Sequence, residues 1–196
     1  MAIENVMMET QQVKTYAVCC TANLKIEAIN QFLVEVHQKE QEERSIPIFT
    51  VVHDLKTRLN GTTKEIRSDD KILKSPFVGL DYHEVQRLLQ QIVKNTGSKI
   101  DTKWFLVLDD ESEHTSSGMI VVVEGEYVRS VRVNYPTTSR DLAAASVAHP
   151  GIDEMIELAN DKCLTALAAG FLDRHLTLKN AFKYRMSLSA GESITR

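Results

Sequence analysis

The chain has 196 residues, of which 43% are apolar and 26% charged, a composition typical of one globular domain and unlike that of a disordered or fibrous chain. Its net charge of −4 argues against nucleic acid as a partner, because phosphate binding needs a basic surface. No stretch reaches the roughly 20 apolar residues of a membrane helix, and the polar start lacks the features of a secretory signal. We therefore expect a cytoplasmic protein that does not bind membranes.

The three cysteines are Cys19, Cys20 and Cys163. An odd count that includes a vicinal pair does not build the disulfide framework of a small secreted domain. The vicinal pair lies where a thioredoxin-like protein carries its redox cysteines, but the C-x-x-C spacing is absent, which favours inert strand residues. We expect three free thiols, with Cys163 buried in a helix.

The chain begins with a strand, a helix and a second strand. TYAVCCT, residues 15–21, is β-branched and aromatic, and LKIEAINQFLVEVHQ, residues 24–38, has apolar residues at helical spacing. Thr21 or Asn23 can supply the N-cap oxygen, and the helix ends in KEQEER, which predicts a solvated end. IPIFTVV, residues 46–52, is the second strand. This order predicts two parallel neighbouring strands joined by a helical crossover.

Residues 54–80 have no apolar period and are interrupted by Asn60-Gly61 and Ser75-Pro76. Connections of this length are usually functional loops, lids or disordered inserts. We predict that this segment is the most mobile internal part of the chain and an early target of proteases.

A helix starts at Asp81. Asp81 and Glu84 have the spacing of a capping box, and Leu80 can pack on Val85 as a hydrophobic staple. The helix is expected to end near Gly97. Its apolar face consists of Val85, Leu88, Leu89, Ile92 and Val93.

Three strands follow. WFLVL, residues 104–108, and MIVVV, residues 119–123, are apolar throughout, which predicts positions inside the sheet. A tight turn at Glu124-Gly125-Glu126 leads into residues 127–135, which alternate between apolar and polar and predict a strand near the edge of the sheet.

The last third is helical, with a short helix over residues 142–148 capped by Ser139 or Asp141 and a longer one from Ile152 to Gly170. We expect a flexible N-terminus over residues 1–12, a single domain over 13–170 and a basic segment over 171–196. The order of elements predicts an α/β (or α+β) fold: a mixed sheet of about five strands flanked by helices, with thioredoxin-like or Rossmannoid layering.

Four segments carry a resemblance to a known family: IPIFTVVHD, DYHEVQRLLQQIV, the pair WFLVLDDES and SGMIVVV, and VRVNY. In this order, across the middle two thirds of the chain, they resemble an uncharacterised α/β domain family of bacteria and fungi that is catalogued as a domain of unknown function. The resemblance implies an α/β fold and carries no activity, cofactor or site residue.

The candidate catalytic residues are His53, Asp109 and Asp110, which follow two apolar strands. If these strands are parallel neighbours, their ends meet at the edge where open α/β sheets place ligands. Clustered carboxylates beside a histidine suit acid–base chemistry, and their oxygens also suit Mg²⁺. The alternative is that acidic residues at a turn only satisfy backbone N–H groups.

Two classes of function follow. The first is a non-catalytic module that binds a protein partner or its own copy as a homodimer, through the edge strand 127–135 or the basic C-terminal segment. The second is a small cofactor-independent enzyme or small-molecule binder that uses His53, Asp109 and Asp110, with residues 54–80 as a lid. No cofactor motif or metal-ligand spacing is present.

Overall fold

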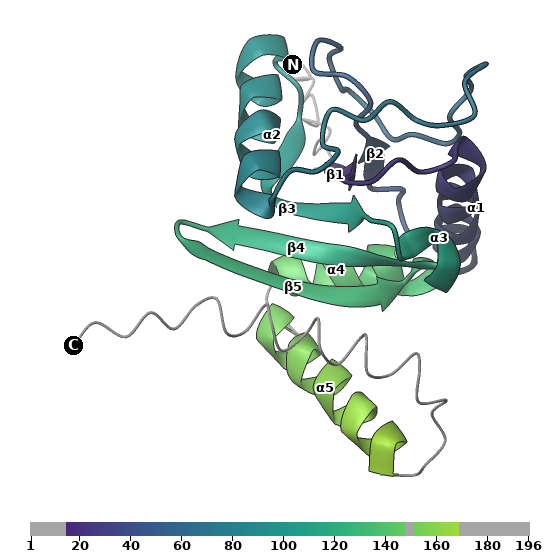
Figure 1. The fold of residues 1–196 in the computed structure, drawn as a ribbon, viewed down its shortest axis with the longest axis vertical. Coiled ribbons are helices and arrows are strands. Elements are labelled where there is room, and N and C mark those ends of the chain that lie inside the picture. Colours follow the sequence, from purple (N-terminus) through teal and green to yellow (C-terminus); the bar gives the residue numbers. More distant parts are fainter. Residues whose placement is uncertain (1–14, 148–150, 169–196) are drawn as a thin grey trace, which may run out of the picture.

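A computed structural model describes residues 15–147 and 151–168, with side chains up to residue 161. Figure 1 shows one twisted sheet with helices on both of its faces. The N-terminal segment 1–12 and the basic segment 171–196, both predicted from the sequence, lie outside the described residues. In the part of the chain that is described, no helix is long and apolar enough to cross a lipid bilayer.

The sheet has five strands in the order β2-β1-β3-β4-β5. Strands β1, β2 and β3 are parallel, whereas β4 is antiparallel to both β3 and β5. The predicted α/β fold with a mixed five-stranded sheet is therefore confirmed, as is the edge position of β5. The strands are β1 (Thr15–Cys20), β2 (Phe49–Val51), β3 (Ile100–Leu108), β4 (Ser117–Glu124) and β5 (Tyr127–Asn134).

One face of the sheet is covered by α1 (Ile26–Glu42), α4 (Thr138–Val147) and the start of α5 (Ile152–Ala168). The apolar stripe of α1 and the buried Leu142 of α4 share one core with every second residue of the strands. Figure 1 shows α5 running on past β5, away from the other strands.

The opposite face is covered by α2 (Tyr82–Thr96). The predicted capping box is confirmed: the Asp81 side chain accepts the Glu84 N–H at 2.8 Å, and the Glu84 carboxylate accepts the Asp81 N–H at 3.0 Å. Gly97 ends the helix in a left-handed conformation, with φ of 67°. Leu80 and Val85 lie in the same apolar cluster, as the predicted staple requires.

The start of α1 differs from the prediction. Neither Thr21 nor Asn23 caps the helix: its N-cap is Lys25, which makes no side-chain capping bond. The N–H of Ile26 is instead accepted by the carbonyl of Lys71 at 3.0 Å, and Lys25 pairs with Ile72 in an isolated bridge. Residues 54–80, which we call the long segment, therefore supply the hydrogen-bond acceptor that a nearby side chain was expected to supply.

Residues 54–80 contain no helix and only that isolated bridge, yet they are packed against the domain. Leu59, Leu73 and Phe77 are buried, so the scattered apolar residues of this segment act as anchors. The Ser75 hydroxyl donates to the carbonyl of Cys20 at 2.6 Å, and the Gly79 N–H donates to the carbonyl of Thr21 at 3.0 Å. The segment therefore closes over the end of β1.

Candidate functional site

The carboxyl-terminal edge of β1, β2 and β3 is where open α/β sheets bind ligands. The helix that follows β1 packs on one face of the sheet, and the helix that follows β2 packs on the other. His53 follows β2, and Asp109 follows β3. However, β1 lies between these strands, which are therefore not the neighbours that the sequence argument assumed. Two strand spacings, about 10 Å, separate them.

His53 lies at the surface, with 55% of its side chain exposed, and its Nε2 atom is 3.5 Å from the Asp54 carboxylate. That carboxylate is already engaged, because it accepts the N–H groups of Thr57 at 2.7 Å and Lys56 at 2.6 Å. The backbone N–H of Thr57 contributes most to holding the pKa of Asp54 below its usual value. Asp54 is therefore an ionised turn cap next to His53.

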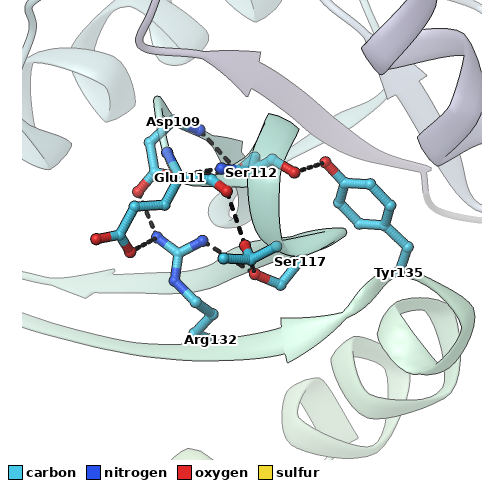
Figure 2. A network of polar contacts seen from close by, with 7 residues as sticks. Asp109, Glu111, Ser112, Ser117, Arg132 and Tyr135 are labelled. Atoms are coloured by element: carbon cyan, nitrogen blue, oxygen red, sulfur yellow. Dashed lines mark hydrogen bonds and ion pairs between the residues drawn. The ribbon is translucent and has the colours of Figure 1, made fainter. Parts of the chain in front are cut away.

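Asp109 is enclosed by hydrogen-bond donors (Figure 2). Its Oδ1 atom accepts the N–H groups of Glu111 and Ser112, at 3.1 and 3.2 Å, and the Ser112 hydroxyl at 3.0 Å. Its Oδ2 atom accepts the guanidinium of Arg132, which comes from β5. Both oxygens are thus used to fix the short helix α3 (Ser112–Thr115) and to tie it to the edge strand.

The contacts extend from Arg132 to a buried tyrosine, as Figure 2 shows. Arg132 also lies 3.3 Å from the Glu111 carboxylate, and it donates to the Ser117 hydroxyl at 3.2 Å. The Tyr135 hydroxyl donates to the Ser112 carbonyl at 2.7 Å, and burial raises the pKa of this phenol. We call these residues, together with Asp109, the Asp109 network.

Asp110 is exposed, and its side chain makes no hydrogen bond or ion pair with the residues that the structure describes. Of the three predicted catalytic residues, only Asp109 is enclosed by hydrogen-bond donors from several parts of the chain. Its carboxylate holds the backbone of α3 in place. Arg132, which organises this environment, belongs to β5, for which the sequence predicted an alternation of apolar and polar residues. Its partner could not be identified, because the register of β4 and β5 was unknown.

A groove of about 440 Å³ lies between the start of α1 and the long segment, residues 54–80. His53 lines it, as do Ile26 at the start of α1 and residues from 63 to 74 of the long segment. Apolar side chains from Ile66 and Leu73 lie beside charged ones such as Arg67. Asp109 and Asp110 do not line this groove. Within the described residues, no group of three or more His, Cys, Asp or Glu side chains could hold a metal ion.

The vicinal cysteines Cys19 and Cys20 are buried, and both are free thiols. Burial raises the pKa of the Cys20 thiol to about 12, and it raises that of Cys19 well above its usual value. Such thiols stay protonated and unreactive. Cys163 belongs to α5, and its side chain lies outside the described part.

A buried polar cluster was not predicted. Glu40, assigned to the solvated end of the first helix, is only 2% exposed. Its carboxylate accepts the Ser139 hydroxyl from α4 and lies 2.7 Å from Nδ1 of His37, whose Nε2 contacts the Thr63 carbonyl at 3.0 Å. Because a carbonyl only accepts, Nε2 carries a proton. The cluster joins α1, α4 and the long segment.

No family model, no curated protein and no solved structure matches this chain. The resemblance to the uncharacterised α/β family therefore stays a prediction.

Proposed function

We propose that this protein is a non-catalytic interaction module that binds another protein chain by adding a strand to the free side of β5. The observation that carries the proposal is the state of this edge. All eight residues of β5 pair with β4 without a bulge, and in the described part of the chain no strand pairs with the other side of β5. Main-chain groups along such an edge are a template for an incoming strand.

The register of β5 identifies the outward groups. The Tyr135 N–H donates to the Ser116 carbonyl at 3.0 Å, so Tyr135 faces β4. Because main-chain groups alternate in direction along an antiparallel strand, the odd-numbered residues of β5 also face β4. The N–H and carbonyl groups of Val128 and Ser130 therefore point away from the sheet.

Several features that usually prevent pairing are absent from β5 itself. It has no proline, lysine or bulge. Its two arginines are neutralised within the chain, because Arg129 pairs with Glu124 and Asp153, and Arg132 pairs with Asp109. The Asp109 network thus supports the proposal, since it holds one edge charge away from an incoming strand.

A photo-crosslinker tests this proposal. Tyr127 begins β5 and is 77% exposed, so Tyr127→p-benzoylphenylalanine is a conservative change. In a lysate of the source cells this variant should crosslink to another chain, whereas the same label at Val34, 61% exposed on α1, should not.

The added change Ser130→Pro should abolish the crosslink. It removes an outward N–H and no bond to β4, so the melting temperature should change little. A label at Tyr127 that captures nothing, or a crosslink that survives Ser130→Pro, would refute the proposal.

A second candidate function, small-molecule binding or cofactor-independent catalysis at His53, is favoured by the position of the groove. It lies beside the carboxyl end of β2, where His53 lines it together with residues of the long segment. Screening of metabolites by thermal shift tests it. A true ligand should stabilise the wild type and should not stabilise His53→Trp, which narrows the groove. Equal shifts in both proteins would exclude the groove.

A further inference from the structure

We infer that the strand added to β5 is β5 of a second copy, so that the protein is a symmetric homodimer with its twofold axis at Ser130. This inference rests on the proposed function of the β5 edge and names its partner. Three observations carry it: the direction of the outward groups, the charges along the strand and the position of α5.

The symmetry restricts the register. Two identical edge strands that pair antiparallel are related by a twofold axis perpendicular to the sheet, so each residue faces one of the same parity. The hydrogen-bonded pairs must come from the even-numbered residues, whose groups point outward. An axis through Ser130 then pairs Ser130 with Ser130 of the partner subunit and Val128 with Arg132 of the partner subunit.

One neighbouring register, with the axis at Val131, is less favourable. It would require the Asn134 carbonyl to accept from Val128 of the partner subunit. That carbonyl already accepts the hydroxyls of Thr138 at 2.9 Å and Thr137 at 3.3 Å. The register centred on Ser130 leaves these contacts intact.

Charges are compatible with self-pairing at Ser130. On the α2 side of the sheet, Arg132 faces the partner subunit's Val128. On the other side, Arg129 faces the partner subunit's Val131. No like charges are directly opposite, which would oppose pairing. The exposed Tyr127 faces the partner subunit's Val133, and aromatic with β-branched pairs of this kind stabilise sheets.

The position of α5 adds a second contact. Its first turns pack through Met155 and Ile156 on the same core as Val131, and it continues past the edge of the sheet (Figure 1). A perpendicular axis places both copies of α5 on one face of the joined sheet, where they flank the junction. Leu158, 54% exposed in the single chain, then lies close to the partner.

Oxidative crosslinking tests the register. In a Cys163→Ser background, Ser130→Cys places two thiols at the axis, where paired Cα atoms lie about 5.5 Å apart and a disulfide can form. The control Val128→Cys is displaced from its own copy by four residues, about 13 Å. Ser130→Cys should give a disulfide dimer on mild oxidation, and Val128→Cys should not. Equal crosslinking of both variants, or none of Ser130→Cys, would overturn the register.

Charge substitution at the axis tests the dimer with folded, uncrosslinked protein. Ser130→Lys and Ser130→Glu each place like charges against themselves, and each should raise the dimer dissociation constant at least about tenfold in sedimentation experiments. An equimolar mixture should restore a heterodimer. Matched changes at Gln91, exposed on α2, should leave the wild-type dimer unchanged. Circular dichroism checks that each variant is folded.

The outcomes separate the two proposals. A wild-type protein that is monomeric at every concentration, or a mixture that fails to associate while the wild type is dimeric, overturns the homodimer at Ser130. If the Tyr127 crosslinker then captures a different protein, the strand-addition function stands with another partner. If it captures nothing, both proposals fail.

Discussion

Replacement of Asp109 by asparagine tests whether this carboxylate is a structural anchor. The amide keeps the shape and the oxygen that accepts the N–H groups of Glu111 and Ser112. It replaces the oxygen that accepts Arg132, whose side chain is only 16% exposed. One charge-assisted hydrogen bond is lost, which costs roughly 1.5–3 kcal/mol. Because Glu111 remains 3.3 Å from the guanidinium, we expect a loss near the middle of this range, about 2 kcal/mol.

Urea unfolding at pH 7 measures this change. The urea midpoint of Asp109→Asn should fall with an unchanged m-value, and its melting temperature should fall by roughly 4–8 °C for a domain of this size. The matched control is Asp110→Asn, an exposed neighbour that should change stability by less than about 0.5 kcal/mol. Arg132→Met alone and with Asp109→Asn completes a double-mutant cycle, and a coupling energy above about 1 kcal/mol is expected.

An active-site carboxylate would behave differently. Removal of a charge that is held in place for catalysis commonly leaves stability unchanged or increases it, because functional sites store unfavourable interactions. If Asp109→Asn is as stable as the wild type or more stable, and the cycle shows no coupling to Arg132, the structural role is refuted. The catalytic hypothesis for Asp109 would then regain support.

Three further predictions concern the buried residues. Burial raises the pKa of Cys20 to about 12; the unfolded thiol ionises near pH 9 while the folded thiol keeps its proton, so stability is full below pH 9 and falls above it. Above pH 9 the slope should be about 1.4 kcal/mol per pH unit steeper in the wild type than in Cys20→Ala, as measured by denaturation between pH 8 and roughly 11. Glu40→Ala removes the buried carboxylate that contacts Nδ1 of His37 and accepts the Ser139 hydroxyl. Each buried group left without a partner costs about 1–3 kcal/mol, so urea unfolding should show a loss of about 2–6 kcal/mol. A loss below about 1 kcal/mol would mean that the cluster is solvated. Phe77→Ala removes a fully buried ring from the long segment, so the free energy of unfolding should fall by about 3–5 kcal/mol and trypsin should cleave faster after Lys74. An unchanged cleavage rate would show that Phe77 does not anchor this segment.

Short-range signals predicted α2 well. The capping box spans four residues, the apolar stripe repeats within one turn, and a glycine follows the last turn, so every signal lies within the element that it describes. The same holds for the turn before β5, where Gly125 has a φ of 61° and joins the apolar strand β4 to the alternating strand β5. Local backbone preferences and apolar periodicity are enough for such elements, because few other conformations satisfy them.

Contacts between distant residues decided the rest. From the sequence, Glu40 is predicted to be solvated, but in the fold α4 places Ser139 against its carboxylate. Asp109 is predicted to be an acidic residue at a turn, but in the fold β5 places Arg132 beside it. The strand order separated His53 from Asp109 by placing β1 between them. These outcomes depend on strand register and helix packing, which are set by the burial of the whole core and by loop closure over many residues. A short stretch of sequence contains information about neither the burial of the core nor the closure of loops. The partners of a polar side chain therefore become known only from the assembled sheet.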